Sequence, residues 1–381
     1  MAPFLPYGRQ TIEDDDIHAV ATALRSDFLT TGPAVEAFET AFAKAVDAPY
    51  AVACNGGTAA LHMAMMSIGT GPGDVCIVPS ITFVATANAA RFCGAEVMFA
   101  DVDPKTGLMT EAGLMDAVGK VAGRGRLKAI LPVHLAGKMV DMTPVNSLAG
   151  ACNAHVIADS CHALGSTVNG RSPAQDAEMA CYSFHPVKTM TTGEGGMVTA
   201  QDAGAAERLK MFRSHGIIRS PHDTAHYDMV ELGYNYRIPD ILCALGLSQL
   251  GKLPRFVERR RAIAALYDAA LPGLSPVLQT CPNGAGDPAL HLYTVQIDFA
   301  ALGRERKAVM DDLRALGIGT QVHYIPVHLQ PYYAARYGVE RLPGAETWHE
   351  RTLSLPIFPE LETHEVAYVI EQVRAACKNT A

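Results

Sequence analysis

Residues 183 to 196 read Ser183-Phe184-His185-Pro186-Val187-Lys188-Thr189-Met190-Thr191-Thr192-Gly193-Glu194-Gly195-Gly196, which places a single lysine in a loop rich in glycine and hydroxyl side chains. The apolar run from Ala177 to Phe184 predicts a short buried strand, and the next apolar run begins at Met197. Lys188 therefore lies in a loop between two predicted strands. Because most lysines in such loops are solvated surface residues, the neighbouring residues decide its interpretation.

The residues around Lys188 favour an anionic ligand. Small residues let backbone N–H groups approach an anion, and a lysine beside them is typical of a phosphate contact or of an amine that forms a Schiff base. The phosphate-loop pattern GxxxxGKS/T does not occur in this sequence. We therefore test along the chain whether Lys188 forms a Schiff base with pyridoxal phosphate (PLP).

The composition is that of a soluble enzyme with one large or two modest domains. The chain has 381 residues, of which 49% are hydrophobic and 18% are charged. Its formal charge is 31 − 39 = −8, so no basic footprint for nucleic acid is expected. Three arginines, Arg259 to Arg261, lie in a predicted helix and are interpreted as a solvated helix face. No apolar run is long enough to predict a membrane span.

No metal site is expected. The nine cysteines are widely spaced and form no CxxC pair, which argues against zinc, an iron–sulfur cluster or a disulfide framework. The acidic residues Glu13 to Asp16 follow Thr11, which predicts the start of a helix with Thr11 as its N-cap. Because the N-terminal residues also lack the basic and apolar regions of a secretory signal, we expect a cytoplasmic protein.

A strand, a glycine-rich turn and a helix follow one another from Ala51. The predicted strand Ala51–Cys54 runs into Asn55-Gly56-Gly57-Thr58, and a predicted helix covers residues 59–68. Unpaired N–H groups at a helix N-terminus can hold a phosphate, although many α/β proteins use glycine there only for packing.

Strands and helices then alternate, which predicts a mostly parallel sheet covered on both faces. The predicted strands are Asp74–Pro79, Glu96–Ala100, Leu127–Val133 and Val156–Ala158. Gly57, Thr58, Asp159 and Lys188 all lie just past the end of a strand, where ligands of such sheets bind. Asp159 could be the partner of the protonated PLP ring nitrogen, or alternatively a structural ion pair or helix cap.

The C-terminal third changes in pattern and predicts a second, smaller α+β domain. After a polar stretch that ends at Asp228 and is interpreted as a mobile loop, two helices are predicted, 241–250 and 254–271. Then come strand 291–297, helix 304–316, strand 320–324 and a closing helix 363–377. We therefore expect a large PLP-binding domain, residues 1–250, which includes an N-terminal substrate segment, and a small domain, residues 251–381.

Six motifs in order identify a resemblance that covers nearly the whole chain. The sequence resembles the DegT/StrS family of sugar aminotransferases in the following stretches: Asn55-Gly56-Gly57-Thr58-Ala59-Ala60-Leu61, Thr82-Phe83-Val84-Ala85-Thr86-Ala87-Asn88, Asp159-Ser160-Cys161-His162-Ala163-Leu164-Gly165, Ser183-Phe184-His185-Pro186-Val187-Lys188, Thr191-Thr192-Gly193-Glu194-Gly195-Gly196 and Gly233-Tyr234-Asn235-Tyr236-Arg237. The resemblance implies the aspartate aminotransferase fold (PLP fold type I) in the α/β class.

The resemblance also implies roles for individual residues. Lys188 would bind PLP covalently and move the proton, and Asp159 would pair with the ring nitrogen. The other implied cofactor contacts are Gly57, Thr58 and Ser183 at the phosphate, Phe83 stacked on the ring, His162 at the phenolic oxygen, and Asn235 reaching over from the neighbouring subunit of a homodimer with shared active sites. The implied substrate contacts are Tyr7, Asp27, Phe28, Leu29, Thr30, His185, Glu194, Gln321, His323 and Tyr324. The chain departs from the family at Gly56, where serine is usual.

Within the family, three stretches are most similar to the transaminase of the pseudaminic acid pathway: Phe184-His185-Pro186-Val187-Lys188, Phe212-Arg213-Ser214-His215-Gly216 and Gln321-Val322-His323-Tyr324. This similarity implies transfer of the amino group of L-glutamate to the C4 ketone of UDP-2-acetamido-2,6-dideoxy-β-L-arabino-hex-4-ulose. The alternatives are a GDP- or dTDP-linked 4-keto sugar, a PLP-dependent sugar dehydratase, which would have histidine in place of Lys188, and a PLP-binding regulatory protein without turnover.

Overall fold

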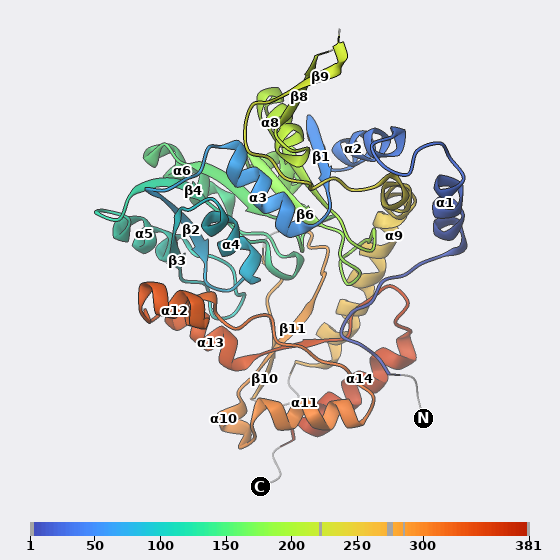
Figure 1. Cartoon of the computed structure of the whole chain (residues 1–381). Coiled ribbons are helices and arrows are strands. Elements are labelled where there is room, and N and C mark those ends of the chain that lie inside the picture. The colour runs from blue at the N-terminus through green and yellow to red at the C-terminus, as the bar shows by residue number, and fades with distance from the viewer. Residues whose placement is uncertain (1–3, 221–222, 273–276, 285, 379–381) are drawn as a thin grey trace.

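The computed structural model of the protein describes residues 4–220, 223–272, 277–284 and 286–378. The centre of the molecule is a seven-stranded sheet (Figure 1). Its strands are β1 (Tyr50–Cys54), β2 (Asp74–Pro79), β3 (Glu96–Ala100), β4 (Arg126–Ile130), β5 (His155–Asp159), β6 (Met179–Ser183) and β7 (Gly196–Ala200). They are arranged in the order β1-β7-β6-β5-β4-β2-β3. β7 is antiparallel to both of its neighbours and the other pairings are parallel. The mostly parallel sheet is therefore confirmed.

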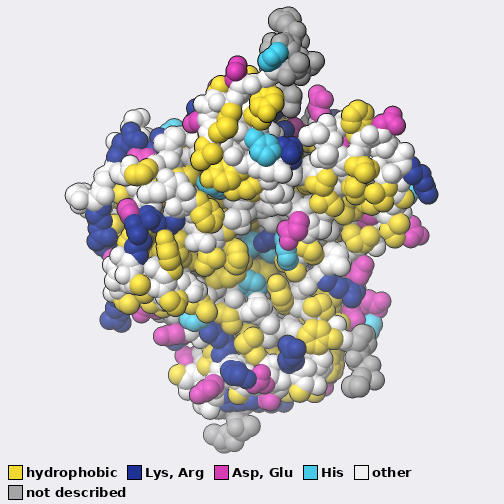
Figure 2. Space-filling view, viewed as in Figure 1, with side chains coloured by type: hydrophobic (Ala, Val, Ile, Leu, Met, Phe, Trp, Pro, Cys, Tyr) yellow, Lys and Arg dark blue, Asp and Glu magenta, His cyan; other side chains and the backbone are white. Residues whose placement is uncertain are grey.

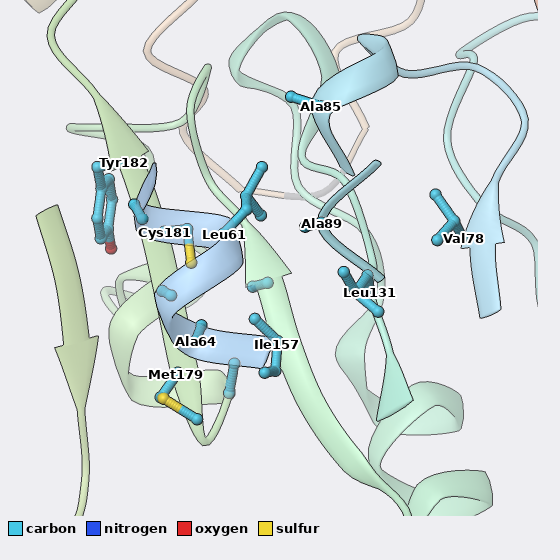
Figure 3. Packing of buried hydrophobic residues seen from close by; sticks show 14 of the residues in the cluster. Leu61, Ala64, Val78, Ala85, Ala89, Leu131, Ile157, Met179, Cys181 and Tyr182 are labelled. Atoms are coloured by element: carbon cyan, nitrogen blue, oxygen red, sulfur yellow. The ribbon is translucent and has the colours of Figure 1, made fainter. Parts of the chain in front are cut away.

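Helices cover this sheet because its strands are apolar on both faces, as in other parallel sheets. They are α2 (Pro33–Ala45), α3 (Gly57–Ser67), α4 (Val84–Phe92), α5 (Glu111–Lys120), α6 (Met142–Cys152), α7 (Pro173–Asp176) and α8 (Ala203–Arg213), with a 3-10 turn, η1 (Leu135–Gly137). The first helix, α1 (Asp14–Leu24), packs against the long helix α9 (Asp240–Ala270) instead. α3 is apolar all round and almost wholly buried, as expected for a core helix. Figure 3 shows Leu61 and Ala64 of this helix beside Ile157 of β5 and Met179 of β6.

The C-terminal part builds a second, smaller layer below the first (Figure 1). An antiparallel sheet of β10 (Leu278–Thr280), β11 (Tyr293–Ile297) and β12 (Thr352–Leu355) forms it together with α9 (Asp240–Ala270), α10 (Phe299–Leu302), α11 (Arg306–Ala315), α12 (Pro331–Tyr337), α13 (Pro343–Arg351), α14 (Thr363–Ala376) and the 3-10 turn η2 (Val327–Leu329). Val295, Leu355 and Val369 belong to its separate hydrophobic core. No helix in the described part of the chain is long and apolar enough to cross a membrane.

One long helix, α9, replaces the two helices that the sequence predicted. Pro254 lies inside it, where a proline ring removes one hydrogen bond and usually breaks a helix. Leu250 and Leu253 before the ring and Phe256 and Val257 after it are all buried, so packing on both sides holds the helix together. We propose that the large and small domains meet along α9, because Leu250 and Val257 of this helix belong to the larger hydrophobic core and Ile263 and Tyr267 belong to the smaller one.

Two further segments differ from the predictions. The polar stretch that was predicted to be a mobile loop forms a hairpin of β8 (Ile217–Ser220) and β9 (Asp223–Met229), which projects from the molecule in Figure 1. The predicted strand 320–324 is not a strand: only Gln321 pairs, with Ser354 of β12. The carbonyls of His323 and Tyr324 bind the Trp348 and His349 side chains of α13 instead of a neighbouring strand.

The arginine run was interpreted wrongly as a solvated helix face. Arg260 is fully buried, and its guanidinium donates to the carbonyls of His291 and Ile357. Helical periodicity alone did not reveal this burial, because polar residues also flank Arg260 in the sequence. The start of α1 also differs: its N-cap is Glu13, which forms a capping box with Asp16, and Thr11 lies outside the helix.

Candidate active site

A cavity of about 920 Å³ opens at the carboxyl ends of the central strands. Figure 2 shows histidine and basic side chains inside the hollow in the centre of this face. Most of the predicted site residues line it: Tyr7, Gly57, Thr58, Phe83, Asp159, His162, Ser183, His185, Lys188, Glu194, Gln321, His323 and Tyr324. The chain therefore brings together residues that are more than three hundred positions apart in the sequence.

The N-terminus of α3 forms one side of the cavity. Gly56 is its N-cap, and Gly56, Gly57, Thr58 and Ala59 all line the space. A Cβ at Gly57 would lie 2.8 Å from the Cβ of Ser183, so only glycine fits there. The unpaired N–H groups and positive dipole end of this helix, with the hydroxyls of Thr58 and Ser183, can hold a phosphate dianion.

Gly56 offers a test of this phosphate site. Its φ of 175° is open to any residue, and a Cβ there would meet nothing within 4 Å among the described residues. Serine is a preferred N-cap and would add a hydroxyl beside the helix N-terminus. We expect Gly56→Ser to lower the dissociation constant of PLP about fivefold, the effect of one added hydrogen bond. Titration of the cofactor-free protein with PLP, followed by absorbance, measures it; weaker binding would contradict this placement of the phosphate.

Asp159 ends β5 at the base of the cavity and is held by two donors. The Thr86 hydroxyl donates to Oδ2 at 2.7 Å, and the backbone N–H of Cys161 donates to Oδ1 at 3.1 Å. Thr82 is hydrogen-bonded to Thr86 in turn. Both bonds leave the negative charge on Asp159 in place, so the carboxylate can face a cation in the cavity. The sequence assigned no role to Thr86, although it lies one helical turn after Phe83 in the same motif.

Lys188 lies on a loop whose conformation is fixed by hydrogen bonds from hydroxyl side chains of the same loop. Thr191 Oγ1 donates to the Phe184 carbonyl at 2.8 Å and accepts from the Gly193 N–H at 2.8 Å. Burial lowers the pKa of the Lys188 amine, while the nearby Cys161 and Asp159 oppose that change. Within the described part of the chain, Lys188 Nζ makes no ion pair. An amine with a lowered pKa and no partner is available as a nucleophile and as a base.

Histidine and tyrosine side chains cover the other wall. His162 Nε2 lies 3.2 Å from the Tyr324 hydroxyl, and His323 Nδ1 lies 2.8 Å from the hydroxyl of Ser354. Burial lowers the pKa of His323 to about 3, so this ring is neutral near pH 7. The rings of Tyr7 and His323 are 5.3 Å apart, and those of Phe83 and Tyr324 are 6.0 Å apart. This wall can therefore bind a flat ring and a polar sugar without adding charge.

These residues together fit PLP. The cavity offers a phosphate site at the α3 N-terminus, an apolar ring at Phe83, a carboxylate at Asp159 and a free amine at Lys188. No group of three metal-ligating side chains occurs among the described residues.

Five of the predicted site residues do not line the cavity of their own chain. Asp27, Phe28, Leu29 and Thr30 lie on an exposed segment between α1 and α2, and the Leu29 carbonyl accepts a hydrogen bond from the backbone of Asp240. Asn235 pairs through its backbone with Ser214, and its carbonyl accepts from the side chain of Asn55. The adjacent Tyr236 lines the cavity instead and had no predicted role.

Comparisons with known proteins agree with this fold. Residues 10–374 match the model of the DegT/DnrJ/EryC1/StrS aminotransferase family. The spore coat polysaccharide biosynthesis protein SpsC of Bacillus subtilis is 35% identical over 98% of this chain and 97% of its own length. The structure is also similar to that of Helicobacter pylori PseC, an aminotransferase involved in the biosynthesis of pseudaminic acid, with a TM-score of 0.91, 29% identity and coverage of 98% and 99% of the two chains. The PLP form of Spr1654, a sugar aminotransferase of Streptococcus pneumoniae described as putative, gives a TM-score of 0.90 with 29% identity and 98% coverage of both chains.

Proposed function

Because this chain belongs to the DegT/DnrJ/EryC1/StrS aminotransferase family, whose members are PLP-dependent sugar aminotransferases, we propose that it transfers the amino group of L-glutamate to the C4 keto group of a nucleotide-linked deoxy sugar. The observation that supports this most strongly is the convergence of the α3 N-terminus, Asp159 and Lys188 on one cavity. Each of these groups suits a different part of PLP, and a transaminase needs all three.

We propose the following roles for these residues. PLP, when bound, supplies an electron sink that stabilises negative charge on the carbon next to the transferred nitrogen. Asp159 keeps the ring nitrogen protonated, because its buried carboxylate favours a neighbouring positive charge. Lys188 Nζ would hold the cofactor. When released, it would move a proton from the Cα of the donor to the cofactor and, in the second half of the reaction, from the cofactor to C4 of the sugar. Gly57, Thr58 and Ser183 hold the phosphate, Phe83 covers the ring, and His162 faces the phenolic oxygen.

The acceptor that we propose is UDP-2-acetamido-2,6-dideoxy-β-L-arabino-hex-4-ulose, as in pseudaminic acid biosynthesis. Two findings support it: the three stretches quoted above and the similarity to PseC over nearly the whole of both chains. Tyr7, His185, Glu194, Gln321, His323 and Tyr324 line the cavity where the sugar would lie. A GDP- or dTDP-linked 4-keto sugar is the alternative, because a few side chains can change such specificity.

The fate of labelled nitrogen tests this function. The enzyme with PLP would be incubated with L-glutamate that carries a heavy nitrogen isotope and with UDP-, GDP- and dTDP-linked 4-keto sugars in separate reactions. We expect mass spectrometry to find the heavy isotope in an amino sugar, and only with the UDP-linked acceptor. Label in a different sugar would identify another acceptor, and an unlabelled dehydrated sugar would support the dehydratase alternative.

We also propose a homodimer with shared active sites. Asn235 and the segment Asp27 to Thr30 lie outside the cavity of their own chain, so their predicted roles require a second copy. Phe28 and Leu29 are half exposed, and Met229, Val230 and Leu232 at the base of the β8–β9 hairpin are more than half exposed. Apolar side chains gathered in this way are typical of a surface that another protein covers.

Mixed dimers provide a test of the shared sites. Lys188→Ala and Asn235→Ala would each be inactive or weak alone, because every site would lack one of the two residues. After the two variants are unfolded, mixed equally and refolded, we expect about a quarter of the wild-type activity, since half of the dimers are mixed and each mixed dimer has one complete site. Activity that does not rise on mixing would show that Asn235 acts within its own chain.

A cytoplasmic location is the remaining part of this proposal. All nine cysteines are free thiols in the structure, and six of them are buried. Unpaired buried thiols are typical of a reducing compartment. Fractionation of cells that make the protein tests this placement directly.

A further inference from the structure

Two histidine rings lie in contact behind the cavity, tilted by 50° to each other. The ring of His291, which precedes β11 in the small layer, lies 4.5 Å from the ring of His162 in the large layer. Both residues are buried, at 3% and 6% exposure. His291 Nδ1 has no hydrogen-bond partner among the described residues, so this ring contributes a flat surface rather than a hydrogen bond at that atom.

The contacts of His162 determine which of its nitrogens carries the proton. The backbone N–H of Ala136 in η1 donates to His162 Nδ1 at 3.3 Å. Since a backbone N–H can only donate, Nδ1 must be unprotonated and the hydrogen of the neutral ring is on Nε2. Nε2 lies 3.2 Å from the Tyr324 hydroxyl, on the cavity side. His162 is thus a single hydrogen-bond donor toward the cavity.

The surroundings of His162 oppose its protonation. If His162 Nδ1 carried a proton, its N–H would face the backbone N–H of Ala136, and neither donor would have an acceptor there. Burial, and to a smaller extent the positive charge of Lys188, lower the pKa of His162 well below its usual value. The other titratable groups that face the ring are His291 and Tyr324, and neither supplies a negative charge near pH 7.

Arg260 fixes the backbone that carries the His291 ring. Its guanidinium donates to the His291 carbonyl at 3.2 Å and to the Ile357 carbonyl at 2.9 Å. Arg260 is fully buried, so these bonds are shielded from water. The position of the His291 ring against His162 is therefore set by α9 and by the chain after β12, and not by the cavity itself.

We propose that His291 is a positioning residue, whose ring packs against His162 and holds it as a neutral single donor toward the phenolic oxygen of the bound cofactor. The proposal rests on the proposed function, in which His162 faces that oxygen. A donated hydrogen bond draws charge from this oxygen, and the oxygen then holds the proton on the nitrogen that joins Lys188 to the cofactor less strongly. Weakening the donor should therefore raise the pH at which that nitrogen loses its proton.

The test is a pH titration of the absorbance of the PLP-bound protein, which needs no turnover. We expect His291→Ala to raise the pH at the midpoint of this titration by roughly one unit, a tenfold change in the proton equilibrium. His162→Leu should raise it by at least as much. The matched control is His291→Phe, which keeps a flat ring and removes only the nitrogens, and its midpoint should stay at the wild-type value. If His291→Ala does not fold, His291→Leu replaces it, because leucine keeps the bulk but lacks the flat ring.

A double variant separates positioning from a direct effect. In a His162→Leu background, His291→Ala should produce no further shift, because there is no imidazole left to position. A wild-type midpoint in His291→Ala or His291→Leu, together with a shifted midpoint in His162→Leu, would overturn the role of His291 alone. An unshifted midpoint in His162→Leu would overturn the proposed role of His162 as well. Equal shifts from His291→Phe and His291→Ala would show that a nitrogen of His291, and not the packing of its ring, is responsible.

Discussion

Lys188→Ala is expected to lower the transamination rate by about four orders of magnitude, since the variant loses both the covalent attachment and the base. The absorbance of the lysine-bound cofactor should disappear at the same time. The structural reason is that Lys188 is the amine lining the cavity opposite the α3 N-terminus, and its pKa is already lowered by burial. Rate measurements with L-glutamate, together with an absorbance spectrum, check both effects.

Lys138 provides the matched control for this variant. It is a buried lysine, at 2% exposure, but its Nζ lies near the carbonyl of Cys281 and outside the cavity. We expect Lys138→Met to keep the absorbance of the bound cofactor. A small added amine should restore part of the activity of Lys188→Ala, because it can carry the proton. Turnover by Lys188→Ala within tenfold of the wild type would contradict the role of Lys188.

Asp159→Asn is expected to lower the rate by about a hundredfold to a thousandfold, the usual effect of removing one electrostatic group from an active site. The amide is close in shape but cannot hold a proton on the cofactor ring by its charge. Its NH₂ group would also face either the Thr86 hydroxyl or the Cys161 N–H, both of which donate to Asp159. The rate constant for the reaction with L-glutamate, measured on the PLP-loaded variant, checks this prediction.

Thr86→Val is the companion variant, because it removes one donor to Asp159 and leaves the charge. We expect a rate loss of about fivefold to tenfold from the missing hydrogen bond. If Asp159→Asn lost no more activity than Thr86→Val, the charge of Asp159 would be unimportant. Asp159 would then be a structural residue, which was the alternative interpretation of the sequence.

The central sheet and its ligand edge could be predicted from the sequence because the signals are local. Buried parallel strands appear as short apolar runs, and Thr58, Asp159 and Lys188 each follow one of them directly. The glycines around Lys188 have a local cause as well: a Cβ at Gly195 would clash with the Thr192 Oγ1, three residues earlier. Such constraints act between residues that are close in the sequence, so the motif alone predicts where these residues lie in the structure.

The residues that the sequence did not reveal depend on contacts between distant segments. Arg260 appears in a charged run, but its partners His291 and Ile357 are 31 and 97 residues away. Thr86 acquires its role only when α4 is placed beside the end of β5. Residues 320–324 have the composition of a strand, but the carbonyls that would pair with a neighbouring strand accept hydrogen bonds from side chains of α13. Tertiary structure outweighs local preference in each case.

The most direct test of transamination by this site is an absorbance spectrum of the PLP-bound protein before and after L-glutamate, and again after a 4-keto nucleotide sugar. We predict that glutamate bleaches the band of the lysine-bound cofactor and that the UDP-linked sugar restores it in proportion to the sugar added. These two steps are the two halves of a ping-pong reaction. A band that glutamate leaves unchanged in the wild-type protein would contradict glutamate-dependent transamination at Lys188.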